Sequence, residues 1–248
     1  MSALPQLGPA PDEVQGHRGA SAVAPENTLA AFRAAAEQGA TWVELDVALL
    51  ADGTLVVIHD DTIDRTTSGQ GSLGDLTWPD LAGMDAGSWF DPRYAGERLS
   101  TLEQVIALLG ELGLSANVEI KQHAHHRSLD QLIDAVRAAI AKRRPQTEIM
   151  ISSFDPECLK AMARLEPELE MAMLWVEPPL DWEARLAAIP ATTIHLYYKA
   201  LSIGFLEQAR DRNIKVRAWT SNDPAELYSF WRAGLTGVIT DDPKVYLG

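Results

Sequence analysis

Apolar segments with two different spacings alternate along most of the chain. From residue 101 onward, segments with apolar residues at helical spacing each precede a short segment rich in β-branched and aromatic residues, which predicts a strand. The predicted helices cover residues 101–112, 129–141, 156–165, 182–188, 203–212 and 223–233. The predicted strands cover residues 115–121, 148–154, 169–175, 192–197, 214–219 and 237–240. This alternation implies a parallel sheet.

The N-terminal part of the chain adds two strands to this series. A strand is predicted at 14–18, and a helix with Asn27 as its N-cap follows it and ends at Gly39. A β-hairpin is predicted over 42–60, and its first arm continues the series. Eight βα units in 248 residues predict an α/β fold, a closed (β/α)8 TIM barrel that forms one domain over residues 1–248. An open doubly wound sheet is the alternative, but no Gly-rich dinucleotide motif follows any strand.

Residues 61–100 interrupt the alternation after the hairpin. They are rich in Gly, Ser, Thr and Asp and form too long a stretch for an ordinary loop. We therefore expect a small inserted lobe, with Trp78, Leu81, Trp89 and Phe90 as its local core.

The hairpin gathers ionisable side chains on one face. Asp52-Gly53 is typical of a two-residue turn, and in that register Asp46 lies directly opposite His59. Glu44 precedes Asp46 by two residues and faces the same side. In apolar strands the two carboxylates repel each other, and all three groups lose hydration. These costs need a cation or a substrate to compensate them. A solvated hairpin face is the alternative interpretation.

Charge and cysteine content narrow the function classes. The net charge of −14 and the pI near 4.8 argue against binding to nucleic acid or to anionic membranes, which needs clustered Lys and Arg. Cys158 is the single cysteine, so we expect no intramolecular disulfide, a buried structural thiol and a reducing, cytoplasmic location. The first 15 residues lack the features of a signal peptide, and no run of about 18 apolar residues predicts a membrane anchor.

Polar residues gather where the predicted strands end, which is where barrels of this type hold their active sites. These residues are His17, Arg18, Glu44, Asp46, Glu119, Lys121, Ser152, Ser153, Trp175, Trp219 and Asp241. Their placement at one rim predicts a functional site there.

Three of these residues predict a metal site. Glu44, Asp46 and Glu119 offer oxygen ligands on neighbouring strands, which suits one divalent cation, Mg²⁺ or Ca²⁺, rather than zinc. Arg18 and Lys121 flank them, and a cation beside two basic side chains suits a phosphate group. A glutamate taken singly more often forms an ion pair.

Two histidines complete the predicted chemistry. His17 and His59 can serve as general acid and general base near neutral pH, although a single rim histidine is often structural. With a metal and a basic pair to offset charge, they predict cleavage of a phosphate ester. Trp175 and Trp219 form either an apolar wall for the substrate or part of the barrel core. Glu26 either aims Arg18 or stabilises a helix N-terminus.

Four other histidines are assigned no catalytic role. His123, His125 and His126 predict a solvated loop, with a site for a soft metal as the alternative. His195 lies within a predicted strand, and we interpret it as structural.

The same residues resemble the glycerophosphodiester phosphodiesterase family. The matching segments follow the family order over nearly the whole chain. They are His17-Arg18-Gly19, Pro25-Glu26-Asn27-Thr28, Glu44-Leu45-Asp46-Val47, Leu55–Asp60 with Arg65-Thr66-Thr67, Thr101-Leu102-Glu103, Val118-Glu119-Ile120-Lys121, Ser153-Phe154, Ala218-Trp219-Thr220 with Asn222, and Gly237–Pro243.

The resemblance implies a barrel with an insertion after the second strand. It implies metal-dependent hydrolysis of glycerophosphodiesters, which are small molecules, to glycerol 3-phosphate and an alcohol. It also implies the residue roles: His17 and His59 as the acid/base pair, Glu44, Asp46 and Glu119 as metal ligands, and Arg18 and Lys121 as phosphate contacts. Trp219 is a further candidate for substrate contact.

Two other functions compete with this one. A phospholipase D-like or lysophospholipase enzyme would need an apolar or basic surface toward a membrane, which the net charge disfavours. A non-catalytic barrel that binds a phosphate ligand would be expected to lack a histidine or a metal carboxylate. The preferred alcohol, the choice between Mg²⁺ and Ca²⁺, the acid and base roles and the oligomeric state stay open.

Overall fold

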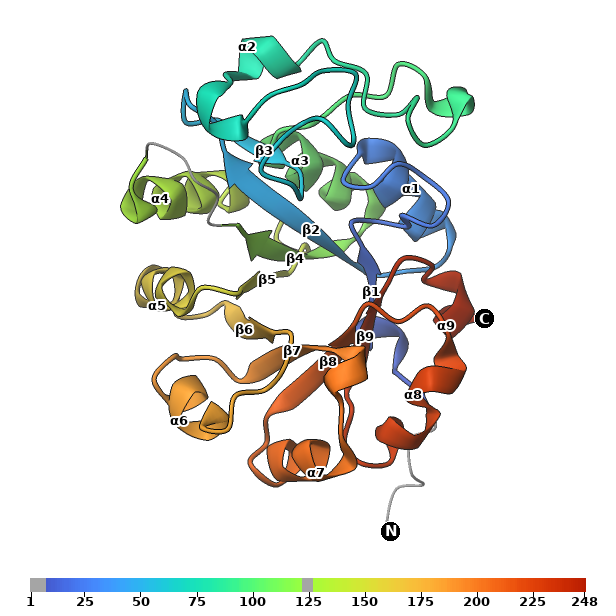
Figure 1. Ribbon diagram of the computed structural model, residues 1–248, viewed down its shortest axis with the longest axis vertical. Coiled ribbons are helices and arrows are strands. Elements are labelled where there is room, and N and C mark those ends of the chain that lie inside the picture. The colour runs from blue at the N-terminus through green and yellow to red at the C-terminus, as the bar shows by residue number, and fades with distance from the viewer. Residues whose placement is uncertain (1–7, 122–126) are drawn as a thin grey trace.

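The computed structural model describes residues 8–121 and 127–248, and a ring of eight parallel strands forms its centre (Figure 1). The ring closes because the first strand pairs with both the second and the last. In sheet order after β1, its strands are β9, β8, β7, β6, β5, β4 and β2. Their bounds are β1 (Val14–His17), β2 (Trp42–Leu49), β4 (Ser115–Ile120), β5 (Ile149–Ser153), β6 (Glu170–Trp175), β7 (Thr193–Tyr197), β8 (Lys215–Trp219) and β9 (Gly237–Thr240).

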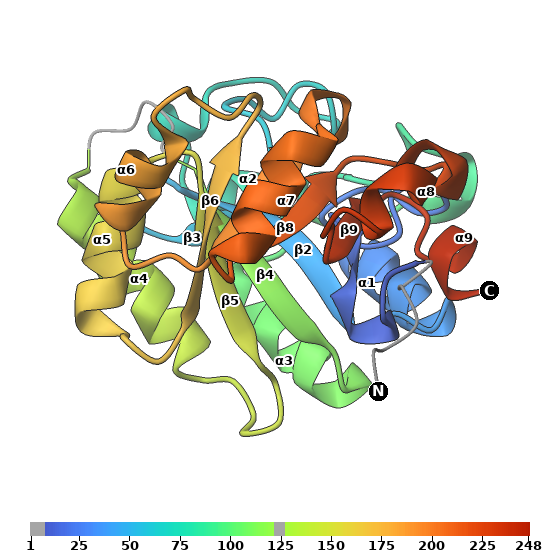
Figure 2. The same ribbon diagram turned by 90° about the horizontal axis from the view of Figure 1, so that it is seen from below.

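Helices surround the barrel on the outside (Figure 2). They are α1 (Leu29–Glu37), α3 (Leu102–Leu112), α4 (Leu129–Ile140), α5 (Pro156–Leu165), α6 (Trp182–Ala187), α7 (Ile203–Asp211), α8 (Pro224–Trp231) and α9 (Lys244–Leu247). Capping boxes begin α3 and α4, where Thr101 and Ser128 bond the backbone of the residues three positions on. The predicted barrel is therefore confirmed, and its elements agree with the prediction to within one or two residues for most elements.

The strands bury different chemistry on their two faces. Along β2, Val43, Leu45 and Val47 belong to the large apolar cluster between barrel and helices. Glu44 and Asp46 alternate with them and face the barrel interior. A shift of one residue would bury the carboxylates among helices, so this alternation fixes how the strand presents them.

Cys158 lies on α5, within the same apolar cluster. Its thiol is fully buried, and burial raises its pKa to about 12. The thiol is therefore protonated at neutral pH and structural, as predicted.

The inserted lobe, residues 61–100, packs against the far end of β2 and the antiparallel β3 (Leu55–Val57) (Figure 1). It contains α2 (Trp78–Leu81) and the short 3-10 helices Leu73–Asp75 and Pro92–Tyr94; two others are Pro11–Glu13 and Tyr198–Ala200. Its apolar cluster is aliphatic and includes side chains from the hairpin: Ala48, Leu50, Val56, Ile58, Ile63, Leu73, Leu81, Ala86 and Leu99.

The predicted core of the lobe is only partly correct. Leu81 is buried and Trp78 packs at the edge of the cluster, but Trp89 is 40% exposed and Phe90 is partly exposed. The two rings meet edge to face at the surface, with centroids 5.7 Å apart. Apolar side chains of the hairpin fill the core of the lobe in place of Trp89 and Phe90.

The turn of the hairpin also differs from the prediction. Its loop has three residues, Ala51-Asp52-Gly53, closed by hydrogen bonds from Leu50 to Thr54 and from Gly53 to Leu50, each 2.9 Å. Gly53 adopts a φ of +90°, which glycine permits at little cost and which a three-residue hairpin loop requires.

The extra loop residue moves the register by one position. Val47 pairs with Val57, and the Ile58 backbone N–H donates to Asp46, so Ile58 and not His59 lies opposite Asp46. The predicted register is therefore wrong. β3 ends at Val57, and the chain beyond it leaves the ladder, which brings His59 to the cavity nonetheless.

Two expectations concern other segments. His123, His125 and His126 lie outside the described residues. No helix in 8–121 or 127–248 is long and apolar enough to cross a membrane.

Candidate active site

A cavity of about 140 Å³ opens at the C-terminal ends of the barrel strands. The sequence-predicted residues His17, Arg18, Glu44, His59, Glu119, Lys121 and Trp219 all line it. They share the cavity with Asn117, Ser152, Phe154, Leu174, His195 and Ile239. The structure thus gathers residues from most strands of the barrel around one space.

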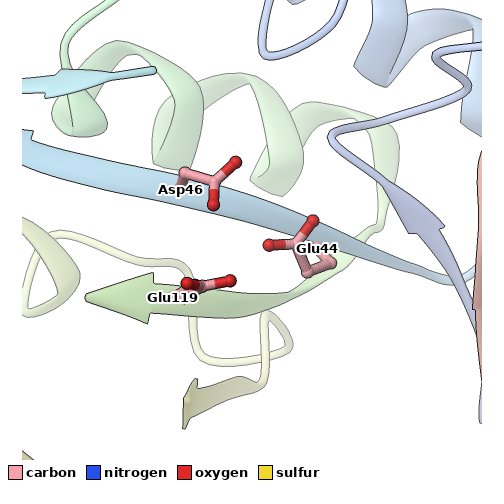
Figure 3. Close-up of side chains that lie close together, drawn as sticks. All are labelled: Glu44, Asp46 and Glu119. Carbon is pink, nitrogen blue, oxygen red and sulfur yellow. The ribbon is translucent and has the colours of Figure 1, made fainter. Parts of the chain in front are cut away.

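Three carboxylates lie close together at the cavity, and two of them, Glu44 and Glu119, line it (Figure 3). Glu44 and Asp46 extend from β2 and Glu119 from β4, and one oxygen of each lies within 4.8 Å of the others. The strand register sets this distance, because Asp46 pairs directly with Glu119. All three side chains are buried.

Burial and mutual repulsion shift the pKa values of these carboxylates in different directions. Burial, together with Asp46 and Glu119, raises the pKa of Glu44 well above its usual range. Burial and Asp46 raise the pKa of Glu119 to about 7. Burial acts in the same sense on Asp46, but Lys121 and Arg18 outweigh it and lower the pKa of Asp46.

The carboxylates fit a hard divalent cation. Glu44 Oε2 accepts a hydrogen bond of 3.0 Å from the backbone of Arg18, while Glu44 Oε1 is buried and has no hydrogen-bond partner among the described residues. A buried, unpartnered carboxylate oxygen is costly unless another group compensates it. Three carboxylates within reach of one point could supply a metal with oxygen ligands.

Two basic side chains stand beside the carboxylates. Lys121 Nζ lies 2.6 Å from Glu119 Oε1 and 3.1 Å from Asp46 Oδ1. Arg18 Nε lies 3.3 Å from Asp46 Oδ2, and its Nη1 donates to Glu26 Oε1 over 2.7 Å. Although burial opposes it, Asp46 raises the pKa of both groups, so both remain cationic. Of the two interpretations of Glu26, the structure shows the contact with Arg18.

The loop after β1 places Arg18 by way of two left-handed residues. Arg18 has a φ of +54° and Asn27 a φ of +57°, and the backbone N–H of Asn27 donates to the carbonyl of Arg18. The Asn27 side chain donates to Asp46 Oδ2 over 2.9 Å. Asn27 is therefore not the N-cap of α1, which is Thr28; it joins the loop to β2.

Gly19 makes this loop possible, and its replacement is expected to destabilise the fold. Gly19 has a φ of +86°, and a Cβ there would lie 2.6 Å from the backbone carbon of Ala31. We expect Gly19→Ala to lower the free energy of unfolding by about 2–4 kcal/mol, because it adds left-handed strain to a clash with backbone. Urea unfolding measures this. Gly39→Ala is the matched control, since Gly39 has a φ of +87° and open space around it; equal losses would contradict the clash.

Each histidine donates a hydrogen bond from Nδ1 to an aspartate carboxylate. His17 Nδ1 lies 2.6 Å from Asp241 Oδ1, and Asp241 also accepts from Ser21 Oγ (2.9 Å) and Asn222 Nδ2 (2.8 Å). Although burial opposes it, these hydrogen bonds lower the pKa of Asp241 to about 2. The carboxylate orients the ring so that Nε2 is available to the cavity.

His59 has a similar partner with a different environment. Its Nδ1 lies 2.7 Å from Asp60 Oδ1, and Arg65 donates to both oxygens of Asp60, over 2.6 and 3.0 Å. Those bonds lower the pKa of Asp60 to about 2. Burial lowers the pKa of His59 itself; Asp46 opposes that shift and nearby cations add to it.

The sequence prediction did not assign the partners of the histidines. Asp60 follows His59 directly, and this adjacency was an available signal. Asp241 was placed at the rim but given no role, because 224 residues separate it from His17 and only the closed barrel joins them. Asn222 lay in a family motif without an assigned contact.

The two candidate tryptophans, Trp175 and Trp219, lie in different environments. Trp219 lines the cavity; it meets Phe154 edge to face and Tyr197 at a tilt, with ring centroids 5.9 and 5.4 Å apart. Trp175 lies in the main apolar cluster. Trp219 is thus the aromatic side chain of the pair that can meet a ligand in the cavity.

His195 is fully buried at the cavity wall. Its Nδ1 lies 3.5 Å from Asn117 Nδ2, and burial lowers its pKa well below the usual range. A neutral imidazole held by a neighbouring amide agrees with the structural interpretation.

Comparison with known proteins places this geometry among phosphodiesterases. A model of the Glycerophosphoryl diester phosphodiesterase family matches residues 17–245. The glycerophosphodiester phosphodiesterase of Caldanaerobacter subterraneus subsp. tengcongensis is 36% identical over 240 residues, covering 94% of this chain and 96% of the relative. The enzyme of that name from Bacillus subtilis is 30% identical over 247 residues, covering 93% and 83%.

Solved structures agree with the sequence relatives. An Oleispira antarctica phosphodiesterase in complex with the product sn-glycerol-3-phosphate superposes with a TM-score of 0.89 at 30% identity, covering 95% of each chain. The Thermotoga maritima glycerophosphodiester phosphodiesterase superposes with a TM-score of 0.75 at 29% identity, covering 95% of this chain and 96% of that one.

Proposed function

Because the chain belongs to the glycerophosphoryl diester phosphodiesterase family, we propose that it hydrolyses glycerophosphodiesters to glycerol 3-phosphate and an alcohol with a divalent cation and two histidines. The observation that carries the proposal is the cavity itself. It holds two aspartate-backed histidines, His17 and His59, beside an acidic triad and two cationic side chains. A barrel that only binds a phosphate ligand would be expected to lack a histidine or a metal carboxylate, whereas this site has all of them.

Glu44, Asp46 and Glu119 are the residues that would hold the cation. When bound, a divalent cation supplies positive charge against the phosphoryl oxygens and the developing charge of the reaction. Arg18 and Lys121 add two fixed cations at the same place, and both have little water around them. They bind the phosphate and stabilise its charge in the transition state.

The environments of the two histidines divide the proton transfers. Asp241 accepts hydrogen bonds from neutral groups besides His17, so its charge is available to stabilise a positive imidazole at His17. Asp60 is neutralised by Arg65, so it stabilises a positive imidazole at His59 less well. His17 is therefore the base and His59 the acid.

The proton balance follows from these roles. His17 Nε2 accepts the proton of the attacking hydroxyl, which belongs to water or to the glycerol 2-position. Protonated His59 donates from Nε2 to the oxygen of the departing alcohol. An anionic phosphodiester bound beside His59 raises its pKa again, which keeps the acid protonated in the complex. Attack by the 2-hydroxyl gives a cyclic phosphate, which water opens in a second step.

The cavity walls suit a substrate with a polar and a less polar end. Asn117 Oδ1 and Ser152 Oγ are buried in the cavity and have no hydrogen-bond partner among the described residues. Hydroxyl groups of the glycerol can satisfy both. Trp219 and the 43% exposed Phe154 offer an aromatic wall nearer the rim for the alcohol. Because this sequence has a single cysteine and therefore no intramolecular disulfide, we propose that the protein acts on diesters in a reducing, cytoplasmic compartment.

The proposal predicts release of glycerol 3-phosphate, which a coupled dehydrogenase assay detects. The purified chain is assayed with glycerophosphodiesters of choline, ethanolamine, glycerol and inositol, in Mg²⁺, in Ca²⁺ and in chelator. We expect release from at least one ester that depends on the cation. Release of phosphocholine or phosphoethanolamine in place of glycerol 3-phosphate would contradict the assigned bond, and no hydrolysis of any ester would contradict the function.

A further inference from the structure

Arg65 lies between Asp60, which contacts His59, and Glu26, which contacts Arg18. It is the first arginine of the inserted lobe, and its guanidinium makes four hydrogen bonds. Nε and Nη2 donate to the two oxygens of Asp60, and Nη1 and Nη2 donate to the two oxygens of Glu26 over 2.7 and 2.8 Å. One planar group thus holds two carboxylates at once.

Each of these carboxylates holds a different residue of the site. Asp60 accepts a hydrogen bond from His59 Nδ1, and Glu26 accepts one from Arg18 Nη1 over 2.7 Å. A continuous series of contacts therefore runs from His59 to Arg18 through Arg65. Arg18 follows β1 and His59 follows β3, so this series of contacts joins two separate loops of the site.

Stabilisation of the fold does not account for such an arrangement. The Arg65 side chain is 45% exposed, and ion pairs at that exposure contribute little to stability. The side chains of Glu26 and Asp60 are more buried, at 12% and 27%, and both face residues of the cavity. The planar guanidinium of Arg65 therefore contacts carboxylates that hold active-site residues.

We propose that Arg65 is a positioning residue that fixes His59 and Arg18 relative to each other, so that the inserted lobe completes the active site. This inference rests on the proposed function of those two residues. Arg18 contacts the phosphate before and during the reaction, so its displacement raises KM. His59 acts in the transition state, so its displacement lowers kcat.

The first test is Arg65→Lys, which keeps the charge and removes the planar fork. With glycerophosphocholine we expect kcat to fall and KM to rise, each on the order of 10-fold or more, because small displacements of reacting groups are costly. Arg93→Lys is the matched control. Arg93 also joins the lobe to the barrel, by donating to the carbonyl of Val23 over 3.0 Å, and it lies outside the cavity. We expect it to change neither constant.

The second test separates the two arms of the fork. In an Asp60→Asn background Arg65→Lys should no longer lower kcat, and in a Glu26→Gln background it should no longer raise KM. Full effects of Arg65→Lys in both backgrounds would overturn the proposal. So would kinetic constants within twofold of the wild type, or equal losses in Arg93→Lys.

A third measurement does not depend on activity. The proton shared between His59 and Asp60 should give a downfield ¹H resonance, assigned by its loss in His59→Gln. We expect that resonance to shift or vanish in Arg65→Lys while thermal unfolding shows a folded protein. An unchanged resonance would overturn the proposal. A wild type that releases no glycerol 3-phosphate would instead contradict the proposed function, and this resonance would still report on Arg65.

Discussion

Replacement of either His17 or His59 with alanine is expected to lower turnover of a natural glycerophosphodiester by on the order of 10²–10⁴-fold. The cavity supplies charge stabilisation through Arg18 and Lys121, but neither cation can accept a proton from the nucleophile. The residual activity comes from that stabilisation and from substrate binding. The double variant should lose less than the product of the single losses, because the two residues act in one step.

A change of leaving group separates the two histidines. A nitrophenyl ester of glycerol phosphate leaves without protonation, so His59→Ala should recover much of the wild-type rate on it. His17→Ala should not, because the nucleophile still needs a base. Single-turnover kinetics on both esters gives the comparison. Rescue of His17→Ala in place of His59→Ala would reverse the assigned roles, and near-full activity of either variant on the natural ester would contradict the two-histidine mechanism.

Local sequence patterns predicted the barrel well because each element carries its own signal. The capped helices and the apolar strands follow from residues within the element, as in α3, where Thr101 and Gln104 form the cap. The hairpin register failed because two turn types share the Asp-Gly pair. The structure selects the three-residue loop, in which Gly53 alone takes a positive φ. The register depends on whether the loop has two or three residues, and the alternation of apolar and polar residues along the strands does not distinguish the two lengths.

The sequence also predicted some residues of the candidate site and missed others. Glu44, Asp46 and Glu119 could be placed because polar residues that interrupt apolar strands are visible in the sequence. The hydrogen bonds that orient the histidines were not visible, since Asp241 reaches His17 only when the last strand closes the barrel against the first. Arg65 is harder still, because its two partners lie 5 and 39 residues away in different loops.

Removal of divalent cations is expected to abolish turnover. Cation binding by Glu44, Asp46 and Glu119 should also raise the free energy of unfolding. Glu44→Gln, Asp46→Asn and Glu119→Gln should each lower turnover on the order of 10²-fold or more while the chain stays folded. Each variant should also need more Mg²⁺ or Ca²⁺ for half-maximal activity. Chelator-resistant activity of the wild type would contradict the metal assignment for the triad.

The pH dependence of unfolding gives a test that needs no substrate. The pKa of Glu119 in the folded, metal-free chain is about 7, above its ordinary value of 4.5, and that of Glu44 is also raised. Between these pH values Glu44 and Glu119 bind more protons in the folded state than in the unfolded state, so their contribution to the free energy of unfolding should fall as pH rises from about 4.5 to 7. The lowered pKa values of His59 and His195 act in the opposite sense below about pH 6.5, so the glutamate contribution is read from the difference between the wild type and a glutamate variant. Asp46 has a lowered pKa and contributes in the opposite sense, at pH values below 4.

Added cation should remove that loss, because it favours the ionised carboxylates. With Mg²⁺ or Ca²⁺ at about 100 times its dissociation constant, the folded state gains about 2.7 kcal/mol by mass action. Thermal unfolding across pH 4.5–7, with and without cation, measures both effects. Glu119→Gln should make the free energy of unfolding of the metal-free protein fall less, or rise more, with pH than in the wild type. Glu103→Gln, which removes a carboxylate paired with Lys142 at the surface, should leave the pH slope unchanged. A wild-type slope that cation leaves unchanged would show that the three carboxylates do not share a metal.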